Sequence, residues 1–255
     1  MISRIKEHQF LFEELVKRDF KKKYKRTIFG MLWSILSPLF MLGVMAVIFG
    51  HLFGGSIPHY LIYLFSGQVV FGYYTESTNG GMSALTGNAN IFTKINVPKY
   101  LFLLSKNISS FINFFIILCI YFLFVVSDGI SFTWKFVTLI YPIFCLVLMN
   151  LGMGLILSAL YIFFRDVEYL YRLFTQIVMY GSAIFYSIDI LPDNLRILFY
   201  CNPIYVCIEY FRSIVIDAAI PSVEIHFLLA GYTVFIVFLG CWMYKKYNYK
   251  FLYYV

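Results

Sequence analysis

Six long apolar runs limit the folds open to this chain more than any other feature of its sequence. Each is close to or above the roughly 20 helical residues that cross a bilayer core. Hydrophobic residues make up 61% of the 255 residues and charged residues only 13%, which is more apolar surface than a water-soluble domain can bury. The sequence therefore predicts an all-α membrane protein with six transmembrane helices. They are expected at about 32–53, 60–78, 103–126, 136–163, 169–190 and 227–244.

The basic residues indicate which helix ends face the cytoplasm. Nine of the twenty Lys and Arg residues precede residue 27, and three more follow residue 244. If both termini are cytoplasmic, the inner segments carry seventeen cations and the outer segments three. Cytoplasmic loops of membrane proteins show this excess, so we expect both termini inside. The net charge of +7 comes from this excess of cations in the inner segments. We therefore expect no nucleic-acid partner.

Residues 1–28 are expected to form an amphipathic helix that lies at the cytoplasmic membrane surface, ahead of a transmembrane domain at 29–255. Apolar residues such as Phe12, Leu15 and Phe20 follow one stripe, and cations fill the other faces. Helices of this kind lie in the headgroup layer instead of crossing the bilayer. An open alternative is that the basic segment serves only as a topology signal.

Two connections between the predicted spans are unusual. The cytoplasmic loop 79–102 contains a short amphipathic stretch that should end at Pro98. The external segment 191–224 is rich in apolar residues, which predicts a helical hairpin that dips back into the outer leaflet and is broken at Pro203. Such a re-entrant backbone is tolerated only against protein or a water-filled cavity.

No pattern in the sequence predicts an enzyme or a metal site. The four His residues lack triad or ligand spacing, and none of the sixteen Gly residues is followed by Lys, which excludes the P-loop motif. A disulfide between Cys201 and Cys207 is conceivable because both lie in the external segment. Glu76, the acid inside a predicted span, is either an interfacial residue or a gate or ligand residue.

Aromatic residues make up 21% of the chain, with 22 Tyr, 29 Phe and 3 Trp. Helix packing and contact with lipid account for most residues of this kind in a membrane protein. Tyr rings can also stack on sugar faces while their hydroxyls form hydrogen bonds. Both interpretations stay open on composition alone.

Three segments carry a family resemblance. Residues 16–39, VKRDFKKKYKRTIFGMLWSILSPL, resemble the opening of ABC transporter type-2 permeases that export polysaccharide or teichoic acid. Residues 87–99, GNANIFTKINVPK, look like the first coupling helix of that family. The FRDV motif at 164–167, Asn202-Pro203 and the EYFR motif at 209–212 are similar to its second half. One departure is Gly181-Ser182-Ala183, where members often carry Ser-Pro at a helix break.

The resemblance implies a transport subunit without an ATPase site of its own. It implies a homodimer in the bacterial inner membrane, paired with two copies of a separate ATPase subunit that binds ATP and Mg. The expected cargo is a lipid-linked, undecaprenyl-pyrophosphate-type polysaccharide such as O-antigen. Teichoic acid, capsule, a drug or a lipid is the alternative cargo. A membrane-embedded transferase is the other alternative, and it would need a catalytic His or paired acids.

The resemblance also implies roles for particular residues, with no catalytic and no metal-binding residue among them. The coupling stretch could instead be a passive loop. For contact with the ATPase it implies Asn90, Phe92, Thr93, Lys94, Val97, Pro98, Arg165 and Asp166. For entry of the lipid headgroup it implies Lys17, Arg18, Lys21, Lys22, Lys25 and Arg26. For the channel and its gate, the external hairpin 191–224, the candidates are Trp33, Phe40, Tyr73, Tyr180, Phe185, Tyr186, Phe199, Tyr200, Tyr205 and Glu209.

Overall fold

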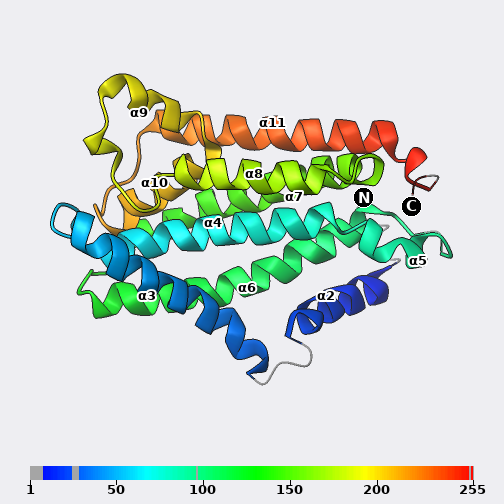
Figure 1. Ribbon diagram of the computed structural model, residues 1–255, viewed down its shortest axis with the longest axis horizontal. Coiled ribbons are helices and arrows are strands. Elements are labelled where there is room, and N and C mark those ends of the chain that lie inside the picture. Colours follow the sequence, from blue (N-terminus) through cyan, green and yellow to red (C-terminus); the bar gives the residue numbers. More distant parts are fainter. Residues whose placement is uncertain (1–7, 25–28, 96, 253, 255) are drawn as a thin grey trace.

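The structure, a computed structural model, describes residues 8–24, 29–95, 97–252 and 254, and within these residues all regular elements are helical. Long helices lie side by side along the molecule (Figure 1). Helices α2 (Gln9–Tyr24) and α5 (Ala89–Phe92) lie towards the same end as the C-terminus, here called the α2 end. Helices α9 (Asp193–Tyr200) and α10 (Pro203–Val215) lie towards the opposite end, here called the hairpin end.

Four helical segments are long and apolar enough to cross a membrane. They are α3 (Trp33–Phe53), α6 (Tyr100–Ser127), the segment Trp134–Phe163 and α11 (Val223–Tyr247). The third begins with the 3-10 helix η3 (Trp134–Leu139) and continues as α7 (Ile140–Phe163). The chain is thus an all-helical, multi-pass membrane protein, and six crossings stay a prediction.

Helix α4 (Tyr60–Met82) coincides with the second predicted span but differs from the others in composition. Its second half contains polar residues such as Thr75, Glu76 and Asn79, and it packs against α3, α6, α7 and α10. Most of its residues are buried. These contacts explain how a helix of modest hydropathy takes the central position in the bundle, because protein atoms instead of lipid surround buried polar side chains such as Ser77 and Thr78.

The predicted span 169–190 is wrong in its length. Helix α8 (Val167–Tyr180) has 14 residues and ends ten residues before the predicted end. A turn follows, in which Ala183 has a left-handed φ of 46°. The Asn202 side chain donates from Nδ2 to the Gly181 carbonyl at 2.9 Å and to Ser182 Oγ at 2.9 Å. The helix therefore breaks at 181–183 without the Ser-Pro pair.

Cys201 and Asn202 separate the next two helices, α9 and α10, and Pro203 is the first residue of α10. Asn202 caps α10 by accepting from the Ile204 amide at 3.0 Å, and Pro203 occupies the first turn, a position that suits its missing N–H. Nearly all of α10 is buried. Cys201 is exposed and Cys207 is buried, and both are free thiols, so the conceivable disulfide is absent. The dip into the outer leaflet stays a prediction.

Glycines allow α7 to approach two neighbouring helices closely. A Cβ added at Gly240 of α11 would lie 2.5 Å from the Gly152 carbonyl oxygen of α7. A Cβ added at Gly81 of α4 would lie 2.8 Å from Gly154 Cα, also in α7. Small residues at such crossings let backbones pack without lipid between them. Helix α7 therefore packs closely against both α4 and α11.

Candidate coupling site

The predicted cytoplasmic loop is shorter than expected. Because α4 continues to Met82 and α6 begins at Tyr100, the connection covers only 83–99. It contains the 3-10 helix η2 (Thr86–Asn88) and α5, which is shorter than the helix predicted to run to Pro98. We call residues 83–99 the coupling segment. Helix α2 packs against the adjoining start of α6.

A buried apolar cluster supports the coupling segment from within the protein. Leu15 of α2 is 2% exposed, and it belongs to the same cluster as Phe92, Val97 and Phe102. Leu15, which belongs to the predicted apolar stripe of α2, therefore contacts protein. The 5% exposure of Phe92 and the 6% exposure of Val97 do not fit the docking role predicted for these two side chains. They instead hold the coupling segment to the bundle.

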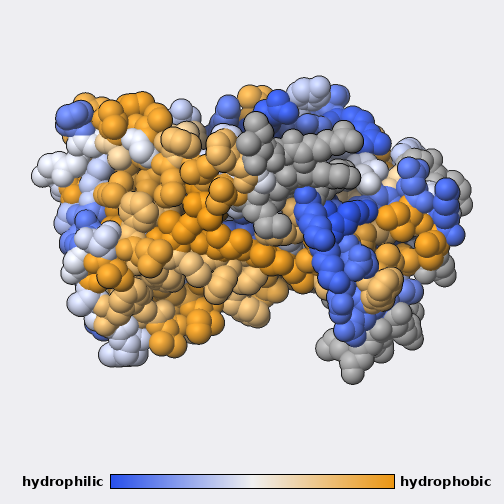
Figure 2. Space-filling model, turned by 90° about the horizontal axis from the view of Figure 1, so that it is seen from below, coloured by the Kyte–Doolittle hydropathy of each residue, from blue (hydrophilic) through white to orange (hydrophobic). Residues whose placement is uncertain are grey.

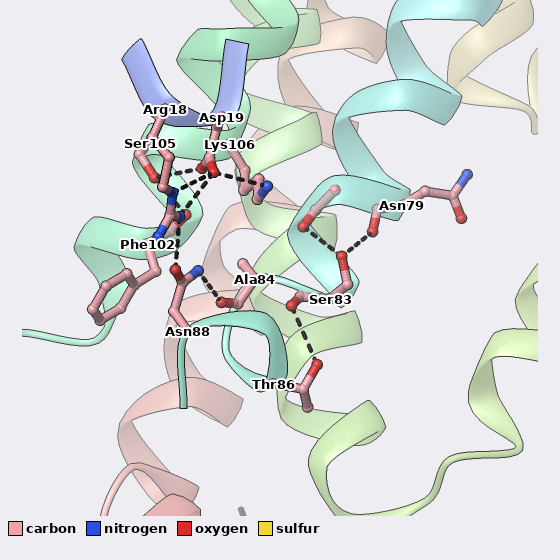
Figure 3. A network of polar contacts seen from close by, with 11 residues as sticks. Arg18, Asp19, Asn79, Ser83, Ala84, Thr86, Asn88, Phe102, Ser105 and Lys106 are labelled. Carbon is pink, nitrogen blue, oxygen red and sulfur yellow. Dashed lines mark hydrogen bonds and ion pairs between the residues drawn. The ribbon is translucent and has the colours of Figure 1, made fainter. Parts of the chain in front are cut away.

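A polar network joins α2 to the start of α6 (Figure 3). Its centre is Asp19, whose side chain is 2% exposed. Asp19 Oδ1 lies 2.8 Å from Arg18 Nη2 and 3.2 Å from Lys106 Nζ, and Ser105 Oγ is a weaker donor at 3.5 Å from Oδ2. A buried carboxylate is stable only with compensating partners, and two cations provide them here.

The same network reaches the coupling segment. Arg18 Nη2 also donates to Asn88 Oδ1 at 2.7 Å, and Asn88 Nδ2 donates to the Ala84 carbonyl at 2.7 Å (Figure 3). Asn88 is 2% exposed. Asp19 and Asn88 lie in the motifs quoted above, but neither residue was predicted to have a role. The signal for Asp19 was that it is the single acid within the basic run 17–26.

The C-terminal tail contacts the coupling segment from another direction. Lys99 Nζ donates to the Asn248 carbonyl at 2.8 Å and lies 5.8 Å from the Phe92 ring centroid and 5.5 Å from that of Phe251. Partial burial lowers the pKa of Lys99 below its ordinary value. Segments from both ends of the sequence therefore meet at this site.

The exposed surface of the coupling segment is mostly polar, although the apolar Ile95 is 55% exposed. Asn90, Thr93 and Lys94 are exposed, while Pro98 is partly buried. Arg165 and Asp166 are exposed in the turn between α7 and α8, and the Arg165 guanidinium lies 4.9 Å from the Tyr161 ring centroid. This turn lies towards the α2 end, as does α5 (Figure 1).

The predicted headgroup residues differ in their surroundings. Lys17 is exposed and lies 3.0 Å from Glu14, whose hydrogen bond raises the pKa of Lys17. Lys21 is exposed, whereas Arg18 is engaged by Asp19 and Asn88. Hydrophilic residues gather over α2, beside the broad hydrophobic surface of the bundle (Figure 2). The side chain of Lys22, and Lys25 and Arg26 altogether, lie outside the described residues.

The predicted channel residues do not share one surface. Trp33, Phe40 and Tyr180 are 41%, 65% and 61% exposed on α3 and α8, whereas Tyr205 is 1% exposed and Glu209 is partly buried in α10. Near the gate, Phe185 is buried, and Tyr186, Phe199 and Tyr200 are partly buried.

Tyr73 and Trp33 line a cavity of about 560 Å³ between α3, α4 and α6. The cavity also contains Glu76, to which Asn113 Nδ2 donates at 2.8 Å. Glu76 is therefore hydrogen-bonded within the bundle and partly buried. The interpretation of Glu76 as a gate or ligand stays open.

Residues 11–216 match a protein family described as ABC-2 type transporter. The chain is 28% identical over 252 residues to an O-antigen export system permease protein, RfbA, of Klebsiella pneumoniae, with 95% of each chain covered. It is 22% identical to RfbA of Myxococcus xanthus, with 92% of this chain and 91% of that one covered. It is also 21% identical to the polysialic acid transport protein KpsM of Escherichia coli, with 91% and 92% covered. The family match covers most of the chain, including α2, the coupling segment and the α9–α10 hairpin, and the chain therefore belongs to the ABC-2 type transporter family.

Proposed function

We propose that this chain is the permease subunit of an ATP-driven exporter that moves a lipid-linked polysaccharide, such as O-antigen, from the cytoplasm to the outer side of the inner membrane. The observation that carries the proposal is the coupling segment, which exposes Asn90, Thr93 and Lys94. Its Asn88 is bonded to Arg18 of α2, and Asp19 beside Arg18 joins α2 to α6. The relatives named for O-antigen export support this cargo. The relative named for polysialic acid transport supports a capsule-type glycan as the second candidate.

A separate ATPase subunit, in two copies, supplies the energy in this proposal. The chain has no P-loop, so ATP and Mg are expected on the partner. Asn90, Thr93 and Lys94 would contact the ATPase together with Arg165 and Asp166. The buried Phe92 and Val97 would make the segment stiff enough to transmit a push.

The proposal includes a homodimer whose channel lies between the two copies. Helix α3 buries only Ser34 and Leu42 among its described side chains. On α8, Leu173 is 60% exposed and Ile177 is 71% exposed. Apolar helix faces in a bilayer contact lipid or protein. A passage for a sugar chain needs walls from more than this one bundle, which favours a second copy on these faces.

Movement of the ATPase would reach the membrane surface through the coupling site. The path runs from the coupling segment through Asn88 and Arg18 to α2, and through Asp19 to Lys106 of α6. Lys17 and Lys21 on the exposed side of α2 would attract the anionic pyrophosphate of the cargo. We therefore expect α2 to move with the coupling segment.

The decisive experiment reconstitutes the permease with its cognate ATPase in proteoliposomes and measures ATP-dependent translocation of the lipid-linked glycan. Lys94→Glu should reduce ATPase co-purification and translocation about tenfold or more, because it reverses a charge at the contact. The matched control is Lys245→Glu, which changes an exposed Lys of α11 outside the coupling segment and should leave both unchanged.

The two parts of the proposal fail in different ways. Normal ATPase pairing and translocation in Lys94→Glu would show that the coupling assignment is wrong. Export of a drug or a simple lipid, but of no glycan, by the wild-type complex would contradict the proposed cargo.

A further inference from the structure

A cavity of about 440 Å³ lies at the hairpin end, within a single copy of the chain. It is bounded by the start of α4, by the segment that follows α8, and by α9 and α10. Tyr63, Asp189, Tyr200, Tyr205, Glu209 and Arg212 are among its lining residues. Its size falls within the range of small-molecule sites, about 300–1,000 Å³. It is separate from the cavity that contains Glu76.

Arg212 is one of the residues that line this cavity, and it is 3% exposed. Its guanidinium lies 3.4 Å from the centroid of the Tyr63 ring, and Nη2 donates to the carbonyls of Tyr63 and Ile184, each at 3.3 Å. These contacts join α10 to α4 and to the turn after α8. They also hold the guanidinium in one orientation beside the cavity.

Two side chains that line the cavity carry buried donors with no partner in the described part of the chain. These donors are Nε and Nη1 of Arg212 and the hydroxyl of Tyr205, which is 1% exposed. Buried polar groups in proteins nearly always have hydrogen-bond partners. A ligand that offers hydroxyl or carbonyl oxygens would satisfy donors of this kind after a small side-chain adjustment.

The charges of the lining select between classes of ligand. The carboxylates of Asp189, Glu209 and Asp217 outnumber the guanidinium groups of Arg196 and Arg212. Arg196 is already engaged, because its Nη2 donates to the Asp189 carbonyl at 2.7 Å. This balance disfavours phosphate and other polyanions, since like charges repel in a partly buried site.

The remaining lining fits a polyhydroxylated ligand. Carboxylates only accept hydrogen bonds and guanidinium groups only donate them, so together they match vicinal hydroxyls, which do both. The ring of Tyr200, which is only partly buried, lies in the lining, and the C–H face of a pyranose can pack on such a ring. A sugar combines both properties in one small molecule.

We propose that this cavity binds a single sugar unit, with Glu209 accepting from its hydroxyls and Tyr205 and Arg212 donating to them. The preference for a sugar follows from the lining alone. The identification of that sugar as a unit of the exported chain rests on the proposed function. The site lies inside each copy, so a dimer would hold two such sites apart from any passage between the copies.

The test uses the full-length permease in nanodiscs, without ATPase or ATP, and saturation-transfer NMR. The probes are D-galactose, D-mannose, L-rhamnose and N-acetyl-D-glucosamine, and oligosaccharides cleaved from the surface polysaccharide of the host. Wild type should transfer saturation to at least one probe. Glu209→Gln and Tyr205→Phe should each weaken that binding about tenfold, the effect of one lost hydrogen bond to a ligand. Asp193→Asn, an exposed change on α9 outside the cavity lining, should bind as wild type does.

Several results would overturn the proposal. One is that no probe receives saturation transfer from the wild type. Another is that the wild type and both cavity variants bind the sugar equally well. A third is that inorganic phosphate displaces the sugar and binds more tightly to Glu209→Gln than to the wild type. Tyr205→Phe removes only one oxygen, and its thermal unfolding in nanodiscs shows whether the protein is folded. Binding of the cleaved oligosaccharides supports a site for the exported chain, whereas binding of free monosaccharides alone supports a site for external sugars. Because the assay needs no transport, failure of glycan export would refute the proposed function and leave this binding result standing.

Discussion

Two charged side chains, Asp19 and Arg212, are buried among the described residues, and they lie in the two candidate sites. Burial makes each of them sensitive to its partners, because an uncompensated charge in a protein interior is costly. Asp19 has Arg18 and Lys106. By contrast, Glu14 and Lys17 pair on the surface of the same helix with 50% and 59% of their side chains exposed, where an ion pair contributes little.

Asp19→Asn should destabilise the folded permease by about 1–3 kcal/mol, because it leaves two cations at a buried site without their counter-charge. It should also lower the ratio of translocation to ATP hydrolysis, since α2 loses its link to α6. Thermal unfolding in nanodiscs and the proteoliposome assay measure the two effects. Glu14→Gln, on the exposed pair, is the control and should behave as wild type. Equal unfolding temperatures for the two variants would show that the Asp19 network carries no stability.

For single residues, the sequence predicted which side chains are exposed better than it predicted which side chains contact one another. The stripe that contains Leu15 and the exposure of Lys17 and Lys21 follow from helical periodicity. The partners of Asp19 do not, because Lys106 belongs to a different helix far along the chain. The burial of Phe92 and Val97 was missed for the same reason, since other segments cover them.

At the scale of helices, run length and hydropathy predicted α3, α6, α7 and α11. The same reasoning failed for 169–190, because the break after Tyr180 is stabilised by Asn202 from the far side of α9. Close packing of α7 with its neighbours depends instead on backbone contact at glycines. The end of α8 and the close packing of α7 both depend on residues from other helices.

Gly240→Ala should separate α11 from α7 and destabilise the protein by about 1–3 kcal/mol, the usual cost of overpacking. The added Cβ would lie 2.5 Å from the Gly152 carbonyl oxygen, a backbone atom that cannot rotate away. Gly231→Ala is a control within the same helix, where no atom lies within 4 Å of the new Cβ. It should be neutral or stabilising by up to about 1 kcal/mol, the helix propensity gain of Ala over Gly. Thermal unfolding of both variants measures the difference, and a smaller loss for Gly240→Ala than for Gly231→Ala would contradict the close α7–α11 crossing.

The whole molecule has two chemically different ends. The α2 end carries the basic helix, the coupling segment and the last lysines (Figure 1). The hairpin end carries the cavity lined by Glu209 and Arg212. The seventeen-to-three distribution of cations predicts that the α2 end is cytoplasmic. The proposed coupling to an ATPase and the proposed external sugar site both require this orientation.

Thiol labelling tests the orientation directly. Single substitutions Lys94→Cys and Asp193→Cys place a new thiol at exposed positions of the two ends, with the wild-type chain and its five native cysteines as background. A membrane-impermeant maleimide should label Asp193→Cys in intact spheroplasts and Lys94→Cys only after permeabilisation. The reverse pattern would place the coupling segment outside the cell and refute the topology together with the ATPase contact.

The sequence by itself determined the membrane class, the charge asymmetry between the two ends and the position of most helices. These properties depend on residues that are neighbours along the chain, so composition and periodicity reveal them. Only the tertiary structure decided that Asp19 is a buried centre of the coupling site, that α8 ends at Tyr180, and that Arg212 lines a polar cavity. Each of these depends on side chains from distant segments that meet in a close-packed interior, and no local pattern specifies which segments will meet.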